Sequence, residues 1–128
     1  MKFKPHAYQQ YAIEYIKEHP VTALLLDMGL GKTVTTLTAI KDLMFDSFEV
    51  ERVLVVAPLR VARDTWPDEL RKWEHLKCMT CSVIVGTLVE RKKALMKQAD
   101  IYIVNRENLA WLFKNSKMKF DMVVLDEL

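Results

Sequence analysis

Short runs of apolar residues alternate along the chain with longer segments in which apolar residues recur every three or four positions. The first segment with this helical spacing ends before His19-Pro20 and contains Tyr8, Tyr11, Ala12, Tyr15 and Ile16. The short apolar runs are too compact for helices and predict buried strands. We predict five strands, at residues 21–26, 52–57, 81–85, 101–104 and 122–125.

The segments between these strands have the apolar spacing of helices. They predict helices over residues 32–45, 61–76, 88–99 and 107–113. Within the second, Pro67 is expected to open the better helix, since proline is tolerated at the first helical position and Asp68 and Glu69 complement the helix dipole. Strands that alternate with helices and are almost continuously apolar imply an α/β fold, a doubly wound parallel sheet covered on both faces.

Composition adds the size and the class of the protein. The 128 residues suit a single domain, and the 51% of hydrophobic and 28% of charged residues are typical of a folded protein. The apolar runs 23–26 and 53–57 are far shorter than the roughly 18 residues of a membrane-spanning helix. Because the first residues also lack the apolar stretch of a signal peptide, we predict a cytoplasmic protein with no membrane partner.

Charge and cysteine content are less informative. The chain has 19 basic and 17 acidic residues, a formal net charge of +2, which neither requires nor excludes a nucleic-acid partner. Cys78 and Cys81 form one C-x-x-C, and a structural zinc would need a second pair. We interpret the two cysteines as residues at the entry of a strand.

A glycine-rich segment, Asp27-Met-Gly-Leu-Gly-Lys-Thr33, lies between a predicted strand and a predicted helix, where a phosphate-binding loop is expected. Its backbone N–H groups and the helix N-terminus would hold phosphate oxygens. Lys32 would reach the β- and γ-phosphates, and Thr33 would offer its hydroxyl to Mg²⁺. Leu26 stands where the full pattern has glycine, and a simple glycine turn is the alternative. The predicted nucleotide-binding residues are Met28, Gly29, Leu30, Gly31, Lys32 and Thr33.

Two acidic residues follow the last predicted strand, in Val123-Val-Leu-Asp-Glu127. The carboxyl ends of parallel strands meet at one edge of a sheet, so these acids should lie beside the glycine loop. Asp126 would hold the magnesium ion through water, and Glu127 would orient and deprotonate an attacking water. The alternative is a pair of exposed acids at the end of a strand. No helix follows this strand in the sequence, and we therefore interpret the chain as truncated within the fold.

Together these motifs resemble the superfamily-two helicases and translocases, and within them the Swi/Snf-type DNA-translocating ATPases. The glycine segment resembles their motif I, which also lacks the first glycine, and Tyr8-Gln9 resembles the Q motif, whose glutamine recognises adenine. Val55-Val-Ala-Pro-Leu-Arg60 is similar to motif Ia, and Ile103-Val-Asn-Arg-Glu107 to a later segment that usually ends in Tyr-Glu. Asp126-Glu127-Leu128 resembles the start of motif II, which reads Asp-Glu-x-His or, in phage-like members, Asp-Glu-Leu-Ser.

This resemblance implies that residues 1–128 form part of the N-terminal RecA-like, ATP-binding lobe of a DNA-dependent ATPase, encoded by a bacterium or phage and associated with the nucleoid. It implies ATP and Mg²⁺ as cofactors and double-stranded DNA as the partner. The DNA backbone would be contacted by Pro58, Leu59, Arg60, Asn105 and Arg106. In the family a second lobe, absent here, supplies arginines to the γ-phosphate, so this chain alone should be nearly inactive in hydrolysis. The resemblance also implies that Lys32, Asp126 and Glu127 are the catalytic residues of the full protein.

Two other functions remain open from the sequence. One is a small P-loop kinase, although Glu127 beside Asp126 suits water activation better than phosphate transfer to a hydroxyl. The other is a nucleotide-binding or interaction remnant that does not cycle ATP. The basic runs Arg91-Lys92-Lys93 and 114–119 would suit phosphates, but solvated faces explain them more simply, and the three tryptophans, at 66, 73 and 111, are expected to pack in the core.

Overall fold

The computed structural model describes residues 25–26 and 32–126, with side chains described from Thr33 onward. Five parallel strands form one sheet in the order β1-β5-β2-β4-β3, which confirms the predicted parallel α/β architecture. The predicted helix near residues 8–16 and most of the predicted strand 21–26 lie outside the described residues. The strands are β1 (Leu25–Leu26), β2 (Val53–Ala57), β3 (Cys81–Ile84), β4 (Ile101–Asn105) and β5 (Met122–Asp126).

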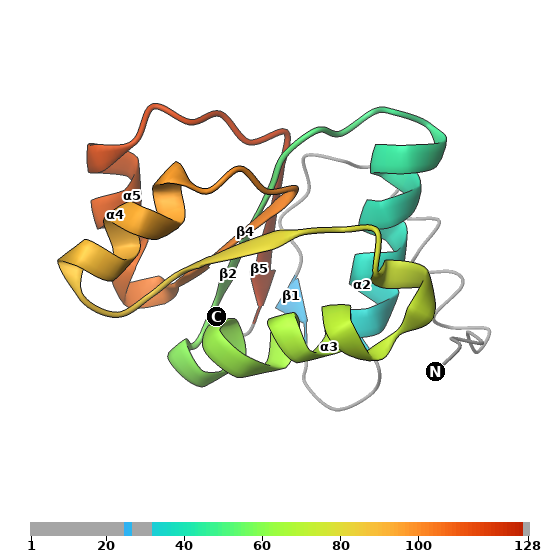
Figure 1. The fold of residues 1–128 in the computed structure, drawn as a ribbon, viewed down its shortest axis with the longest axis horizontal. Coiled ribbons are helices and arrows are strands. Elements are labelled where there is room, and N and C mark those ends of the chain that lie inside the picture. Colours follow the sequence, from blue (N-terminus) through green and yellow to red (C-terminus); the bar gives the residue numbers. More distant parts are fainter. Residues whose placement is uncertain (1–24, 27–31, 127–128) are drawn as a thin grey trace.

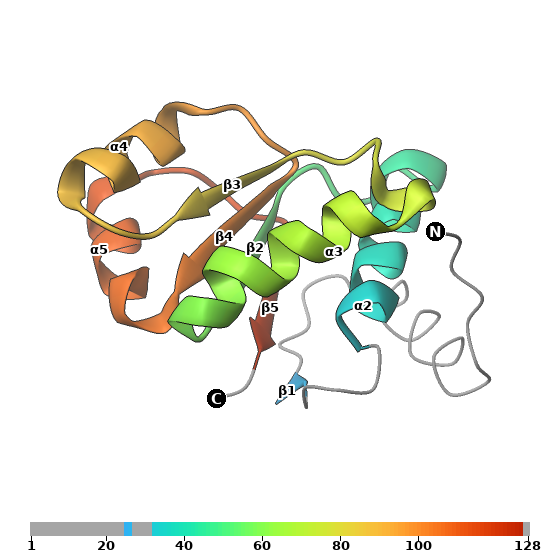
Figure 2. The same ribbon diagram turned by 60° about the horizontal axis from the view of Figure 1, so that its bottom comes forward.

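Helices cover both faces of this sheet. On one face lie α2 (Lys32–Lys41) and α3 (Trp66–Lys72), and on the other lie α4 (Leu88–Met96) and α5 (Leu109–Asn115), as Figures 1 and 2 show. The connections from β1 to β3 move along the sheet in one direction and those from β3 to β5 move back. Since parallel crossovers are nearly always right-handed, this reversal places the two pairs of helices on opposite faces. No helix in the described part of the chain is long and apolar enough to cross a membrane.

Alternate strand residues feed two hydrophobic clusters. Val53 and Val55 of β2 point to the cluster under α2 and α3, while Leu54 and Val56 point to the cluster under α4 and α5. All five residues of β2 are buried, as are all five of β4. A central strand buried on both faces has to be apolar throughout, which is why periodicity could identify it from the sequence.

The four helices predicted between the strands differ in extent from the observed ones. The stretch 32–45 divides into α2 and a π-helical turn (Asp42–Asp46). The stretch 61–76 divides into a π-helical turn (Val61–Thr65), α3 and a 3₁₀ turn (Glu74–Leu76), because Trp73 has an extended backbone. The stretch 88–99 ends at Met96, where Lys97 becomes extended and its Nζ donates to the Cys81 carbonyl at 2.9 Å. The stretch 107–113 begins as a 3₁₀ turn (Arg106–Asn108) before α5 runs to Asn115.

Local hydrogen bonds set the start of α4. Thr87 accepts from the backbone N–H of Glu90 at 3.2 Å, and the Glu90 carboxylate accepts from the backbone N–H of Thr87 at 3.3 Å, a capping box. Gly86 precedes this cap with a φ of 93°, and a Cβ there would lie 2.9 Å from the Glu90 carboxylate. Glycine is therefore required at the turn into α4.

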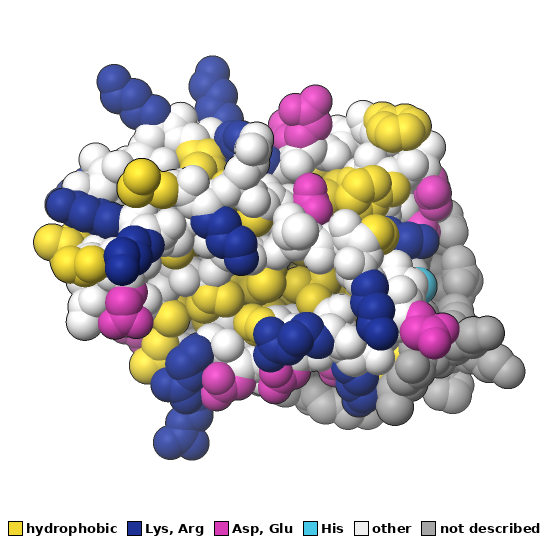
Figure 3. Space-filling model, viewed as in Figure 1, with side chains coloured by type: hydrophobic (Ala, Val, Ile, Leu, Met, Phe, Trp, Pro, Cys, Tyr) yellow, Lys and Arg dark blue, Asp and Glu magenta, His cyan; other side chains and the backbone are white. Residues whose placement is uncertain are grey.

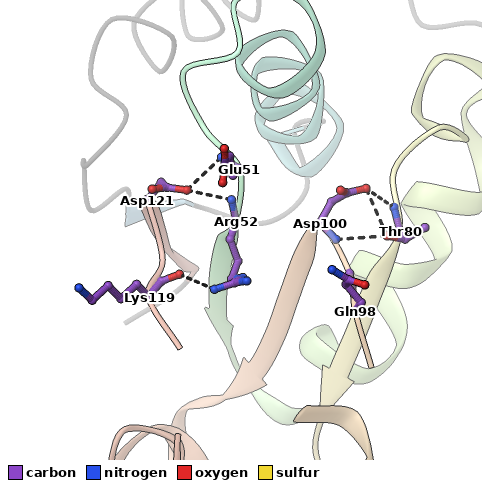
Figure 4. A pocket seen from close by; sticks show the side chains of 8 residues that line it. Glu51, Arg52, Thr80, Gln98, Asp100, Lys119 and Asp121 are labelled. Atoms are coloured by element: carbon purple, nitrogen blue, oxygen red, sulfur yellow. Dashed lines mark hydrogen bonds between the residues drawn. The ribbon is translucent and has the colours of Figure 1, made fainter. Parts of the chain in front are cut away.

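Carboxylates fasten the loops at the amino ends of the strands. Asp121 Oδ2 accepts the backbone N–H groups of Glu51 and Arg52, both at 3.0 Å, and Asp100 Oδ2 accepts the N–H of Thr80 at 2.9 Å (Figure 4). These side chains line a polar pocket together with Gln98, Ala99 and Lys119. Since both carboxylates are committed to backbone groups, this edge of the sheet is built for stability.

His75, in the 3₁₀ turn, packs against α2. Its Nε2 lies 2.7 Å from Thr38 Oγ1, and that hydroxyl already donates to the Val34 carbonyl at 2.7 Å, so the ring nitrogen has to be the donor. Burial lowers the pKa of His75 below its ordinary value of 6.5, and the charge of Lys41 lowers it further. Protonation of His75 therefore favours the unfolded chain.

We expect the free energy of unfolding to fall as the pH drops from about 7 to about 5. The contribution of neutral His75 is fully present above the unfolded pKa near 6.5 and is lost as the pH falls through the lower pKa of the folded protein. His75→Gln keeps an N–H donor but does not titrate, so its stability should fall less over the same range. Urea unfolding at several pH values measures this difference, and parallel curves for the two proteins would contradict it.

Candidate functional site

The ends of β1 and β5 lie side by side. The two strands are parallel, and Leu26 is paired in register with Asp126. Residue 27, which begins the glycine segment, therefore follows a position directly opposite Asp126. The chain then returns to the described region at Lys32, where α2 begins, and Thr33 in its first turn is 8% exposed. The described ends of both motifs are thus at one edge of the sheet.

Asp126 is buried at this edge and is held by a tryptophan. Its side chain belongs to a residue that is 1% exposed, and Oδ2 accepts a hydrogen bond of 2.9 Å from Nε1 of Trp66, which is itself fully buried at the start of α3. A hydrogen bond to a charged group is stronger than a neutral one, so the indole fixes the orientation of the carboxylate.

This contact was not foreseen from the sequence, where Trp66 was assigned only to the core. The core assignment is confirmed, because Trp66 lies in the cluster under α2 and α3. A buried indole N–H usually has a hydrogen-bond acceptor, and this rule could have suggested a polar partner for Trp66. Asp126 is the acidic residue at the end of the last strand, at the same edge of the sheet.

The segment after β2 has two exposed arginines, Arg60 and Arg63, and Arg63 forms an ion pair. Residues 58–60 follow the strand, with Leu59 and Arg60 exposed, and lead into the π-helical turn. Arg63 lies in that turn and pairs with Asp64, with 3.0 Å between Nη2 and Oδ2. The hydrogen bond from Arg63 lowers the pKa of Asp64, so this pair stays ionised over a wide pH range. Arg60 is exposed, and its charge also lowers the pKa of Asp64.

The segment after β4 turns its asparagine inward and its arginine outward. Asn105 is 6% exposed, donates to Glu107 at 2.9 Å and accepts from Asn108 at 2.7 Å. Arg91 of α4 donates to the side-chain oxygen of Asn108, and its guanidinium lies 4.5 Å from the ring centre of Trp111. Of the two residues predicted to touch DNA here, the structure exposes Arg106 and uses Asn105 to hold the turn.

Neighbouring strands bring these two segments together. β2 and β4 are adjacent, and Ala57 is paired in register with Asn105. The segments that carry Arg60 and Arg106 therefore leave the sheet from adjacent positions, at the carboxyl edge. Of the predicted nucleotide and catalytic residues, Gln9, Met28, Gly29, Leu30, Gly31 and Glu127 lie outside the described residues, as does the side chain of Lys32.

The cysteine pair lies far from this edge. Cys78 is exposed and Cys81 begins β3, and both are free thiols. Burial raises the pKa of the Cys81 thiol, which disfavours the reactive thiolate. Within residues 33–126, no three His, Cys, Asp or Glu side chains gather as metal ligands.

Comparison with known families decides the classification. The family model described as DEAD/DEAH box helicase matches residues 6–128, which is nearly the whole chain. The chain belongs to the DEAD/DEAH box helicase family. The RecA-like parallel sheet of this helicase lobe, with its two motif-bearing strand ends at one edge, agrees with that membership.

A curated phage protein is similar to this helicase lobe over almost the full length of the lobe. It is protein p41 of Acyrthosiphon pisum secondary endosymbiont phage 1, which is 38% identical over 128 residues. The match covers 98% of the present chain and 28% of the phage protein, so the helicase lobe spans little more than a quarter of its relative.

Proposed function

We propose that the chain is the ATP-binding lobe of a DNA-dependent ATPase of the Swi/Snf type, similar to the phage-like members of that group. The observation that carries this proposal is the pairing of Leu26 with Asp126, because the glycine segment 27–33 follows Leu26 in the sequence and Glu127 follows Asp126. Binding and hydrolysis of a nucleoside triphosphate require a phosphate-binding loop and a carboxylate at the same edge of the sheet.

In this proposal the two motifs divide the work on ATP. The backbone of residues 28–31 and the N-terminus of α2 hold the phosphates, Lys32 neutralises the β- and γ-phosphates, and Gln9 recognises adenine. Glu127 activates water as the base.

The magnesium ion would be held by oxygen ligands from the start of α2 and the end of β5. The hydroxyl of Thr33 and the carboxylate of Asp126 are hard oxygen donors of the kind that Mg²⁺ prefers, and both residues are nearly buried at the edge. When bound, the ion would neutralise charge that develops on the phosphates. The hydrogen bond from Trp66 Nε1 to Oδ2 would hold this carboxylate in one orientation for the ion or its water ligands.

The DNA contact in this proposal lies at the same edge. Arg60, with Pro58 and Leu59 beside it, and Arg106, on the turn held by Asn105, are presented from adjacent strands. Contacts from these arginines to backbone phosphates would carry no sequence information, so binding should be sensitive to salt and indifferent to sequence.

ATP with magnesium should raise the melting temperature of the chain, and Lys32→Ala should abolish that rise. A ligand that binds only the folded state, present at about 100 times its Kd, adds about 2.7 kcal/mol to the free energy of unfolding. Thermal unfolding with and without ATP and Mg²⁺ measures the effect. Lys41→Ala, at the other end of α2, is the matched control and should keep the full shift.

The outcome separates the competing functions. An unchanged shift in Lys32→Ala would overturn the assignment of the phosphate loop. A wild-type chain that shows no shift with any nucleotide would be an interaction remnant. Transfer of the γ-phosphate to an added hydroxyl acceptor, in place of release of phosphate, would make the protein a kinase.

A further inference from the structure

Positive charge is concentrated in one part of the chain. Residues 88–119 contain eight Lys and Arg and three Asp and Glu, a net charge of +5. The whole chain has a net charge of +2, so the remaining residues together carry −3. The helices α4 and α5, which form a layer on one face of the sheet, contribute Arg91, Lys92, Lys93 and Lys114 to this excess and Glu90 as their acidic residue (Figure 1). An excess of positive charge on one face of a nearly neutral protein attracts polyanions.

Side-chain contacts join the two helices of this layer. Arg91 of α4 reaches across to Asn108 and Trp111, at the start of α5 and within it, while Ala94, Leu95 and Leu109 pack towards the sheet. The inward positions of both helices are thereby filled. All five lysines of the two runs are exposed, and one of them, Lys119, lines the polar pocket at the amino ends of the strands. The other four are Lys92, Lys93, Lys114 and Lys117. We refer to these four as the lysine patch.

Figure 3 shows separate Lys and Arg side chains over the part of the surface where α4 and α5 lie, with few acidic side chains among them, and further Lys and Arg side chains beside acidic ones over α3. Among the side chains that the structure describes, no member of the lysine patch forms an ion pair with a carboxylate. The helix on the opposite face differs, since Arg63 and Arg71 there pair with Asp64 and Asp68. Mutual repulsion makes an unneutralised patch costly for the folded state, and a bound polyanion removes that cost.

The packing of α4 on the sheet favours a nucleic acid over a membrane as the partner of this layer. Val89, Met96 and Phe113 are 62%, 86% and 58% exposed and lie among the lysines. A helix that binds a membrane surface turns a continuous apolar face outward, but the apolar side of α4, with Ala94 and Leu95, is packed on the sheet. Isolated apolar groups between ammonium groups are compatible with the rim of a phosphate-binding surface.

We propose that the lysine patch is a second contact for the phosphate backbone of double-stranded DNA, separate from the strand-end contact at Arg60 and Arg106. This inference rests on the proposed function, because it takes DNA as the partner. Both α4 and α5 begin at the carboxyl edge of the sheet and run away from it, so a duplex bound at the edge can continue along the layer. α4 alone, at about 1.5 Å per residue, is about 13 Å long, roughly four base pairs of duplex rise.

The test measures binding of the chain to a fluorescein-labelled duplex of about 20 base pairs by fluorescence anisotropy, between about 50 and 200 mM salt. The test variant is Lys92→Gln/Lys114→Gln, which removes one charge from each helix. The matched control is Lys72→Gln/Lys77→Gln, which removes two lysines from the opposite face, at α3 and just after the 3₁₀ turn. Thermal unfolding confirms that both variants fold, and the ATP-dependent shift in melting temperature should be the same in both.

We expect the test variant to bind DNA at least roughly tenfold more weakly at low salt, and the slope of log K against log salt to fall by about 2, one for each lost phosphate contact. The control should change the Kd less than about twofold. An equal loss in both variants would show an effect of net charge alone and overturn the proposal.

Other outcomes separate this inference from the proposed function. If the test variant binds like wild type while Arg60→Ala/Arg106→Ala weakens binding, the strand-end contact stands and the patch proposal is wrong. If the wild-type chain binds vesicles containing phosphatidylserine but not the duplex, the partner of the patch is a lipid surface and the DNA proposal is overturned, whereas the ATP-dependent shift remains an independent measure of the nucleotide site.

Discussion

ATP turnover stimulated by DNA should be nearly absent in the 128-residue chain and strong in a version extended by a second helicase lobe. In the family that the motifs resemble, that lobe supplies arginines to the γ-phosphate. A contribution of this kind is worth about 10³ to 10⁵ in rate, because it stabilises charge that develops in the transition state. Phosphate release from ATP, with and without double-stranded DNA, measures the difference. Robust DNA-stimulated turnover by the short chain would contradict this division of labour.

The extended version also tests the role of the second acid. Glu127→Gln should keep the ATP-dependent rise in melting temperature and lose turnover, because it removes the base but leaves the phosphate cradle and Asp126 intact. Glu74→Gln, in the 3₁₀ turn on the α3 side, is a matched loss of one carboxylate and should leave turnover unchanged. Equal activity of Glu127→Gln and wild type would remove Glu127 from the catalytic residues.

The second large effect concerns Trp66. Trp66→Ala should destabilise the chain by about 3–5 kcal/mol, since it empties a fully buried site in the core. Trp66→Phe retains an aromatic ring but removes the N–H that Asp126 accepts, and it should cost about 1.5–3 kcal/mol. Unfolding in urea measures both changes.

A comparison with another tryptophan isolates the hydrogen bond. Trp111 is partly buried, and its ring lies under Arg91, so Trp111→Phe should cost only about 0.5–1 kcal/mol. A double-mutant cycle of Trp66→Phe with Asp126→Asn should show a coupling energy between the two sites. Additive effects would mean that the hydrogen bond contributes nothing beyond packing.

The strands were predictable because the central ones are apolar without interruption. Val53–Ala57 and Ile101–Asn105 are buried on both faces, so the hydrophobic pattern alone located them within a residue or so. The helix boundaries were less predictable, because they depend on contacts outside the helix. The end of α4, for example, coincides with the bond from Lys97 to the carbonyl of Cys81.

The candidate site was predictable in its position but not in its supports. The rule that parallel strands end at a common edge placed Asp126 beside the glycine segment, and the register of Leu26 with Asp126 agrees with it. The sequence could not reveal that Asn105 faces inward, since its neighbour Arg106 is equally polar and the orientation depends on hydrogen bonds to Glu107 and Asn108. It also could not pair Trp66 with Asp126, which are distant along the chain.

Trp66 lies between the segment proposed to contact DNA and the carboxylate proposed to hold magnesium. It begins α3 directly after the turn Val61–Thr65, which continues from the exposed residues 58–60, and its indole N–H lies 2.9 Å from Asp126. A DNA duplex that pulls on residues 58–60 would move the start of α3, and the indole would carry that movement to the carboxylate. In the proposed function, Trp66 therefore links the segment expected to contact DNA with the carboxylate expected to hold magnesium.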